Sequence, residues 1–109
     1  MSFKVKITGN FEKEAKPLIK KYPSFKSDIF KLISDLALNP MLGTSLGHNL
    51  FKIRVAISSK GRGKSGGARV ITYVISQNET VTLISIYDKA EYDTASIDAL
   101  LEILKNEGL

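Results

Sequence analysis

The spacing of apolar residues along this chain changes several times, and each change indicates a new element of secondary structure. At the start, Phe3, Val5 and Ile7 alternate with Lys4 and Lys6. A period of two is typical of a strand with one buried and one exposed face. The chain therefore predicts a half-buried β-strand near its N-terminus.

Two apolar stripes at helical spacing follow this strand. Asn10 is a suitable N-cap for the first helix, and we expect Pro17, inside the stripe, to kink that helix or force an irregular turn. The second helix begins at the plausible cap Ser24 and ends at Asn39-Pro40. We interpret the two helices as an antiparallel hairpin packed on a sheet.

The second half of the chain returns to strand-like patterns. Residues 41–49 are expected to form a loop, and alternation from residue 50 to 57 predicts a strand. The run 68–76 is apolar without clean alternation, as expected of a central strand covered on both faces. A further strand is predicted at 80–87, and a short helix behind the candidate cap Ser96 closes the chain.

The predicted order is β-α-α-β-β-β-α in a single domain that covers residues 1–109. This order favours the α+β class, with a mainly antiparallel four-stranded sheet, a leading helical hairpin and a C-terminal helix. The composition, 43% apolar and 25% charged, is that of an ordinary globular domain. No repeat or interdomain linker interrupts the pattern.

The composition also excludes several kinds of site. There is no cysteine, so a disulfide, a thiolate nucleophile and a Cys-ligated zinc are impossible. His48 is the only histidine, which excludes a multi-histidine metal site. We expect no metal and no other cofactor. The N-terminus lacks an apolar signal core, and we expect a cytoplasmic protein that does not enter a membrane.

The distribution of charge is the most informative feature for function. Between Asp35 and Glu79 there is no acidic residue, whereas the same segment holds six basic ones. The whole chain has a formal net charge of +5, so everything outside this segment sums to −1. The basic residues are Lys52, Arg54, Lys60, Arg62, Lys64 and Arg69. A local positive field of this kind favours a phosphate-rich partner, although a solvated basic face is the simpler alternative.

The predicted hairpins bring distant basic residues together. Pairing through residues 77–79 places Arg69 near Tyr87, and pairing through residues 58–67 places Arg54 beside Arg69. Lys89 follows the last strand directly. We therefore expect Lys52, Arg54, Arg69 and Lys89 to gather near one edge of one sheet face.

Such a cluster suits cleavage of RNA by attack of the 2′-hydroxyl on the adjacent phosphate. Arginines can neutralise the developing phosphorane charge, and a lysine among other cations can approach the pKa of a proton-transfer group. Glu91 and Tyr92 are further candidates for proton transfer. In the alternative, Arg69 only pairs with Asp88, and Glu91 and Tyr92 only shape the turn before the last helix.

The Gly- and Lys-rich loop 58–67 is a candidate RNA-binding element, with Lys60, Arg62, Lys64 and the nearby Tyr73 as contacts. It is not a Walker A motif, because Ser58 stands where the first glycine is required and a strand follows instead of a helix. Histidine is the residue type best suited to act as a general base near neutral pH, which makes His48 a candidate, but a lone loop histidine is more often a surface residue.

These residues, in this order, resemble the RelE/ParE toxin superfamily, and more closely its RelE/HigB-like branch. The likeness covers nearly the whole chain. It rests on Leu46-Gly47, Phe51-Lys52-Ile53-Arg54, Gly66-Gly67-Ala68-Arg69-Val70-Ile71-Thr72-Tyr73 and Ile86-Tyr87-Asp88-Lys89-Ala90-Glu91.

The resemblance implies a ribosome-dependent mRNA endonuclease, the toxin of a type II toxin–antitoxin pair, inhibited by a cognate antitoxin. It implies that Lys52 and Arg54 form the family's basic pair, that Arg69 contacts the scissile phosphate, and that Lys89 is the basic residue after the last strand. Tyr92 is the nearest counterpart of the family's C-terminal tyrosine or histidine. Superfamily members that poison gyrase lack this set, so a non-enzymatic gyrase inhibitor and a degenerate protein that only binds antitoxin or nucleic acid remain alternatives.

Overall fold

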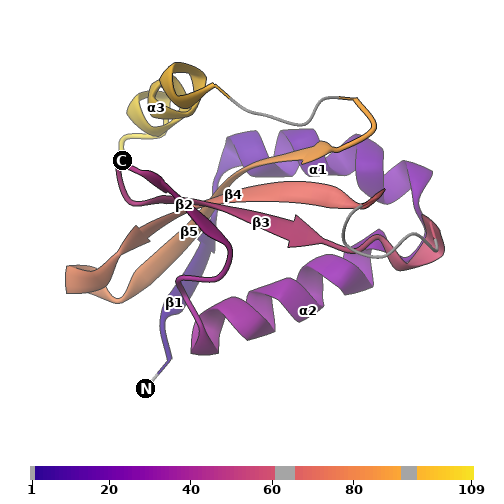
Figure 1. The fold of residues 1–109 in the computed structure, drawn as a ribbon, viewed down its shortest axis with the longest axis horizontal. Helices are drawn as coiled ribbons and strands as arrows, with labels where there is room; N and C mark the ends of the chain where they lie inside the picture. The colour runs from indigo at the N-terminus through magenta and orange to yellow at the C-terminus, as the bar shows by residue number, and fades with distance from the viewer. Residues whose placement is uncertain (1, 61–65, 92–95) are drawn as a thin grey trace.

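A computed structural model of the chain describes residues 2–60, 66–91 and 96–109. Strands and helices follow one another as the alternation of periods predicted, with one additional strand (Figure 1). The elements are β1 (Lys4–Ile7), α1 (Gly9–Lys21), α2 (Phe25–Leu38), β2 (Thr44–Gly47), β3 (Leu50–Val55), the 3-10 turn η1 (Ser58–Lys60), β4 (Ala68–Ile75), the 3-10 turn η3 (Ser76–Asn78), β5 (Thr80–Asp88) and α3 (Ile97–Asn106).

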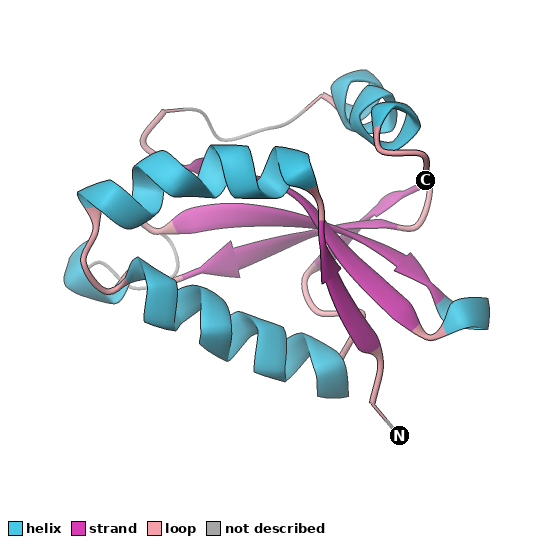
Figure 2. Ribbon diagram, turned by 180° about the vertical axis from the view of Figure 1, so that it is seen from behind, coloured by secondary structure: helices cyan, strands magenta, loops and turns pink. Residues whose placement is uncertain are grey.

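The strands form one sheet in the order β1-β5-β4-β3-β2. β1 runs parallel to β5, and the other neighbours are antiparallel. The α+β class, the helical hairpin and the C-terminal helix are confirmed. Helices α1 and α2 lie together on one face of the sheet, as the view from behind shows (Figure 2). Two buried apolar clusters result, one on the side of α1 and α2 and one that includes Leu100 and Leu104 of α3.

The prediction of a loop over residues 41–49, and hence of four strands, was wrong. Residues 44–47 form β2, an edge strand paired with β3. The strand is four residues long and has one apolar side chain, Leu46, so it shows no alternation. The pairing is closed by the two-residue turn His48-Asn49, whose φ angles of 55° and 63° are those of a type I′ hairpin turn. Neither residue is the glycine that usually marks such a turn.

The helix boundaries agree with the prediction at three caps out of four. Asn39 ends α2, Ser24 precedes it, and Ser96 caps α3 through its hydroxyl, which accepts from the Ala99 N–H. The cap of α1, however, is Thr8 instead of Asn10, since the Thr8 hydroxyl accepts from the Phe11 N–H at 3.0 Å.

Pro17 does not end α1, which is helical from Gly9 to Lys21. A proline in a helix leaves the carbonyl four residues earlier without its usual partner. Here that residue is Lys13, and both Lys13 and Pro17 are exposed, so water can serve the carbonyl instead. The expected irregular turn is therefore absent.

Polar side chains of α1 complete the edge of β5 beyond the end of β1. The Asn10 amide donates to the Ile84 carbonyl at 2.9 Å. The Glu14 carboxylate accepts from the Ser85 hydroxyl at 2.7 Å and from the Ile86 N–H at 3.3 Å. These bonds satisfy backbone groups that would otherwise be left unpaired in a buried strand. Among the described residues, no helix has the length and apolar character needed to span a membrane.

Candidate nucleic-acid interface

The pairing of β3, β4 and β5 brings the predicted cations together. Arg54 lies opposite Arg69, and Arg69 lies opposite Tyr87, so these three residues form one row across three strands. Lys52 is two residues from Arg54 and shares its face of the sheet. Lys89 follows β5, and its N–H donates to the Gly67 carbonyl at 3.1 Å. The register thus confirms the predicted convergence for Arg54 and Arg69, with Lys52 on the same face, and the backbone of Lys89 lies beside the residue that precedes β4.

Hydrogen-bonded and non-hydrogen-bonded residue pairs alternate between the antiparallel strands β3 and β4, and this alternation brings the side chains of Arg54 and Arg69 close together. The Val55 carbonyl is directed at the chain entering β4, since a Cβ placed on Gly67 would meet that oxygen at 2.0 Å. Neighbouring Arg54 therefore turns its backbone groups away from β4 and forms a non-hydrogen-bonded pair with Arg69. Side chains are closest in pairs of this kind. Two like charges there are unfavourable for folding alone, and an anion between them would relieve the repulsion.

The four cations differ in exposure. Arg54 is exposed, and Lys52 and Lys89 are half-buried. Arg69 is only 2% exposed, and its Nη1 donates to the Ala68 carbonyl at 3.1 Å. Its guanidinium therefore lies beneath the surface, where a charge has a strong field and requires polar partners. Nothing in the sequence pattern indicated this burial.

Asp88, the residue suggested as a simple partner of Arg69, is itself buried. Its carboxylate accepts from the Tyr22 hydroxyl at 2.8 Å and from the Ala90 N–H at 3.0 Å. Strand alternation directs Asp88 toward the face covered by α1, away from the row of Arg54, Arg69 and Tyr87. Asp88 thus anchors the end of β5 to α1.

The remaining predicted site residues have diverse positions. Glu91 is exposed in the turn after β5, where its N–H donates to the Asp88 carbonyl. Arg62, Lys64 and Tyr92 lie outside the described residues, as does the side chain of Lys60.

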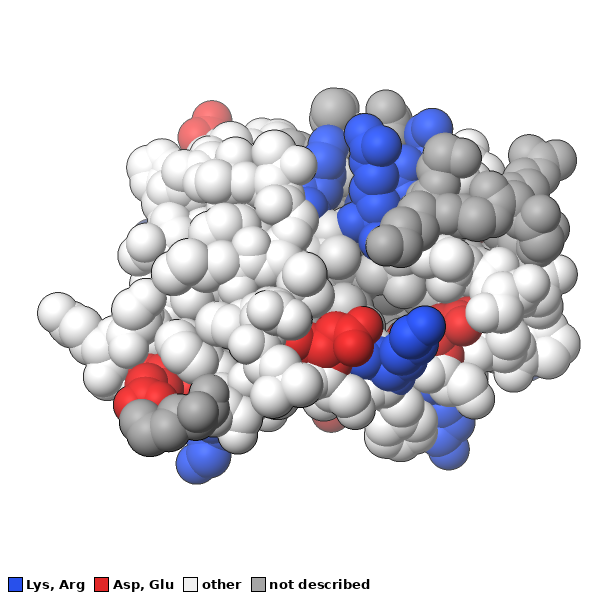
Figure 3. Space-filling view, turned by 60° about the horizontal axis from the view of Figure 1, so that its bottom comes forward, with Lys and Arg blue, Asp and Glu red and all other residues white. Residues whose placement is uncertain are grey.

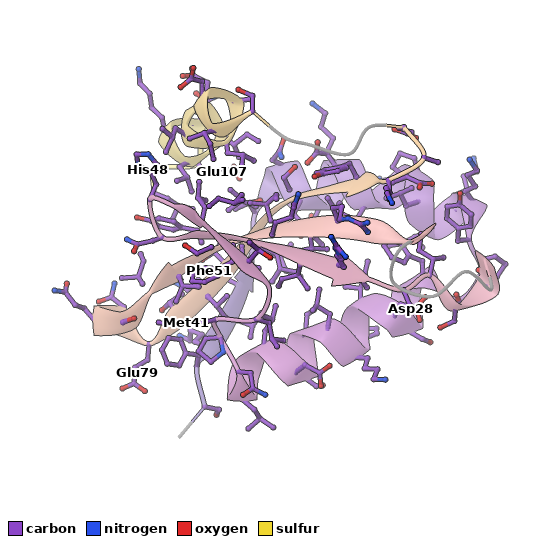
Figure 4. The ribbon with its side chains drawn as sticks, viewed as in Figure 1. Asp28, Met41, His48, Phe51, Glu79 and Glu107 are labelled. Atoms are coloured by element: carbon purple, nitrogen blue, oxygen red, sulfur yellow. The ribbon has the colours of Figure 1, made fainter. Side chains whose placement is uncertain are left out.

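Tyr73 and His48 are not brought to this cluster. Tyr73 is opposite Leu50, four residues along β3 from Arg54, which is about 13 Å at the usual rise of a strand. Its half-buried side chain packs against the cluster beneath α3. His48 is exposed at the β2–β3 turn, at the end of the molecule opposite Asp28 (Figure 4). Neither residue can contact a phosphate held between Arg54 and Arg69.

Two features of this region were missed by the sequence analysis. Tyr87 was noted only as a neighbour of Arg69, yet its cross-strand position makes it part of the row, and the register alone could have shown this. The second feature is a groove of about 850 Å³ between α2 and the edge of β3. In Figure 3, Lys and Arg side chains gather above a hollow, and below it acidic side chains lie on both sides of a basic one.

Asp28, at one end of the groove, is held as a carboxylate. Burial raises its pKa, but hydrogen bonds from the Ser58 hydroxyl, the Ser58 N–H and the Ser24 hydroxyl, with Lys31 nearby, bring the pKa below its usual value of 3.8. These bonds measure 2.6, 3.0 and 3.0 Å. Asp28 therefore ties the first turn of α2 to η1. Among the described residues, no group of His, Asp or Glu side chains is arranged to hold a metal ion.

No protein-family model matches the chain. Its fold, however, is similar to that of solved toxin structures. A double mutant of the E. coli toxin RelE in the free state, with two arginines replaced by alanine, aligns with 97% of this chain and 98% of its own, at 16% identity and a TM-score of 0.63. The isolated E. coli RelE toxin aligns with 96% of this chain and 98% of its own, at 16% identity and a TM-score of 0.60. The chain therefore has a RelE-like fold along almost its entire length.

Proposed function

We propose that this protein is the toxin of a type II toxin–antitoxin system and cleaves mRNA on the ribosome. The observation that carries the proposal is the row of Arg54, Arg69 and Tyr87, flanked by Lys52 and Lys89, on a RelE-like fold. Three of these four cations, Lys52, Arg54 and Arg69, come from the segment between Asp35 and Glu79, which has no carboxylate. Such a surface suits a phosphodiester whose charge grows during the reaction.

In the proposed reaction, the 2′-oxygen attacks the adjacent phosphorus, the bond to the 5′-oxygen breaks, and a 2′,3′-cyclic phosphate forms. Arg54 and Lys52 contact the non-bridging oxygens, and the buried charge of Arg69 strengthens the positive potential beneath them. The proton leaves the 2′-hydroxyl and another reaches the 5′-oxygen. We assign these transfers to the segment after β5, with Lys89, Glu91 and Tyr92 as candidates. The side chains provide the charge, so the proposed hydrolase works without a metal.

The proposed partners are mRNA, the ribosome and a cognate antitoxin, all in the cytoplasm. Lys60, Arg62 and Lys64 supply further contacts to RNA in this proposal. Tyr73 has no part at the cleaved phosphate, because its ring packs under α3 at the other end of β3–β4.

A role without catalysis is the second candidate, and the burial of Arg69 favours it. Arg69 is only 2% exposed, so its guanidinium can touch a phosphate only after the surrounding structure rearranges. A gyrase inhibitor, or a protein that only binds antitoxin or nucleic acid, needs no such rearrangement. The same fold accommodates either function.

Cleavage of ribosome-bound mRNA decides between the two. Primer extension should map discrete cuts, and the upstream fragments should end in a cyclic phosphate. We expect Arg54→Ala and Arg69→Ala to lower the cleavage rate on the order of 10²–10³-fold, the cost of losing one preorganised charge contact. Lys6→Ala, which removes an exposed charge from β1 at the opposite edge of the sheet, is the matched control and should cleave normally.

If the wild-type protein makes no cuts and inhibits DNA supercoiling by gyrase, the protein is a gyrase inhibitor without catalytic activity. Circular dichroism is needed for Arg69→Ala in particular, since removal of a buried side chain can unfold the chain. Full cleavage by a folded Arg69→Ala protein would remove Arg69 from the reaction.

A further inference from the structure

The last residue of β5, Asp88, joins the end of the sheet to the end of α1. Asp88 is only 1% exposed, and its Oδ2 accepts a hydrogen bond of 2.8 Å from the Tyr22 hydroxyl. Tyr22 is the C-cap of α1, and the two residues lie 66 positions apart in the sequence. Loss of this bond would take a donor from a buried carboxylate, which is costly, so the bond fixes the two ends relative to each other.

The sequence around Tyr22 places its hydroxyl for this contact. Pro23 follows, and a residue that precedes proline is disfavoured in the helical conformation. Tyr22 accordingly has φ −117° and ψ 109°, so the helix ends there, while the Tyr22 N–H still donates to the Leu18 carbonyl. The Nζ of Lys21 lies 5.3 Å from the centre of the Tyr22 ring, a cation–π contact. Backbone and ring are therefore both restrained.

Asp88 also closes the turn that follows β5, residues 88–91. Its Oδ1 accepts from the Ala90 N–H at 3.0 Å, and its backbone carbonyl accepts from the Glu91 N–H at 3.0 Å. Lys89, within this turn, donates its own N–H to the Gly67 carbonyl at 3.1 Å. The backbone that carries Lys89 is therefore held by Asp88 on one side and by the start of β4 on the other.

One carboxylate thus links α1, through Oδ2, to the turn 88–91, through Oδ1. From this arrangement we infer that Tyr22 and Asp88 are positioning residues for Lys89. The hydrogen bond from Tyr22 fixes the Asp88 carboxylate, and the carboxylate fixes the turn. This role rests on the proposed function, in which the segment after β5 carries out the proton transfers of RNA cleavage. It requires no contact between RNA and either Tyr22 or Asp88.

A link that served stability alone would not require a charged group. Two apolar side chains of similar size are often as stable in such a place, since a buried carboxylate must first lose its water. What a carboxylate adds is direction, because its two oxygens accept from donors on separate elements in defined geometry. Catalysis depends on direction, since a misplacement of about 1 Å can cost on the order of 10²-fold in rate. The charged link lies directly before Lys89, where such precision matters.

The test measures single-turnover cleavage of ribosome-bound mRNA at increasing concentrations of the full chain. Tyr22→Phe keeps the ring and removes only the hydroxyl. We expect the rate at saturation to fall about 10–100-fold, while the protein concentration that gives half the maximal rate stays within about twofold of wild type. The two effects separate because the substitution changes no charge and removes no contact to RNA in the inferred arrangement.

Ser85→Ala is the matched control. It acts at a second link between α1 and β5, where the Ser85 hydroxyl donates to the Glu14 carboxylate at 2.7 Å. Like Tyr22→Phe, it removes one hydroxyl donor from a carboxylate between these two elements, but it leaves the turn 88–91 untouched. It should keep the wild-type rate at saturation.

A double-mutant comparison shows whether the link acts through Lys89. In a Lys89→Ala protein, the side chain to be positioned is gone. Adding Tyr22→Phe should then change the residual rate by less than about twofold, because the two changes remove the same contribution. A general loss of structure would instead lower the rate by the same factor with and without Lys89.

Hydrogen exchange follows the link independently of cleavage. Ala90 is exposed, yet its amide should exchange slowly in the wild-type protein because it is bonded to Asp88. Tyr22→Phe should speed this exchange and Ser85→Ala should not. The measurement on the wild-type protein tests the link even if Tyr22→Phe fails to fold.

Three results would overturn the inference. They are a wild-type rate at saturation for Tyr22→Phe, an equal loss of rate with and without Lys89, and fast exchange of the Ala90 amide in the wild-type protein. A wild-type protein that makes no cuts would overturn the proposed function and, with it, the role of Tyr22 and Asp88. The two kinds of failure are distinct, because the second is seen before any variant is compared.

Discussion

Gly43 precedes β2 and Gly47 is its last residue, and both have a positive φ, 93° and 81°. They differ in their surroundings. A Cβ on Gly43 would lie 2.3 Å from the Lys52 carbonyl oxygen, whereas a Cβ on Gly47 would meet nothing within 4 Å. The sequence shows two glycines in a presumed loop and cannot separate them. The structure assigns backbone freedom to both and close packing to Gly43 alone.

We therefore expect Gly43→Ala to destabilise the protein more than Gly47→Ala. The second change carries only the cost of a left-handed backbone, about 1 kcal/mol. The first adds a steric clash with backbone, which brings the expected loss to roughly 2–4 kcal/mol. Urea unfolding of both variants measures the difference. Equal losses would mean that the chain around Gly43 can shift away from β3.

At the scale of elements, patterns that repeat over several residues were predicted well and short ones were not. Alternation over residues 50–57 and helical spacing over α2 led to the correct elements, since each pattern includes several periods. β2 has four residues and was missed. The cap of α1 was misplaced by two residues because both Thr8 and Asn10 are good caps, and the contact of Asn10 with Ile84 lies 74 positions away in sequence.

The hydrogen bonds of Asp28 that join α2 to η1 lead to a prediction about how the stability of the fold depends on pH. Because the folded pKa of Asp28 lies below its unfolded value of 3.8, the carboxylate stabilises the fold above that value. This contribution is lost as the pH falls through the lower, folded pKa. We expect Asp28→Asn to lower the free energy of unfolding at neutral pH and to reduce its decline below about pH 4.

Unfolding followed by circular dichroism from about pH 7 to about pH 2 measures this effect. Asp35→Asn is the control, since Asp35 lies further along α2 and its side chain has no hydrogen bond to a described residue. That variant should keep the wild-type pH dependence. If Asp28→Asn keeps it as well, the bonds from Ser24 and Ser58 do not favour the charged form in solution.

At the scale of the whole molecule, the position of the candidate site on the sheet could be predicted from the sequence, but the burial of Arg69 within it could not. The order of the strands predicts two antiparallel hairpins, and their register places Arg54, Arg69 and Tyr87 in one row. The burial of Arg69 depends on what covers that face of the sheet, which alternation within a strand cannot show. The groove escaped prediction for a similar reason, because it requires α2 to pass beside an edge that β2 leaves open.

The charge of the whole molecule leads to the last prediction. The segment between Asp35 and Glu79 holds six cations and no anion, so RNA should bind there and release counterions. Replacing Lys60, Arg62 and Lys64 by glutamine should reduce the slope of log affinity against log salt by about 2, at roughly 0.7–0.9 for each lost phosphate contact. Fluorescence anisotropy with a short single-stranded RNA measures the slope.

A second triple variant shows whether the salt dependence of RNA binding depends on where the charges lie or only on the net charge of the protein. Lys13, Lys16 and Lys20 are exposed on α1, which covers the face of the sheet opposite the row of Arg54 and Arg69. Replacing these three by glutamine removes the same charge from the molecule. It should leave the slope nearly unchanged, because contacts to phosphate release counterions and distant charges do not. Equal reductions in both variants would show that RNA responds to overall charge, and the acid-free segment would then be a solvated basic surface.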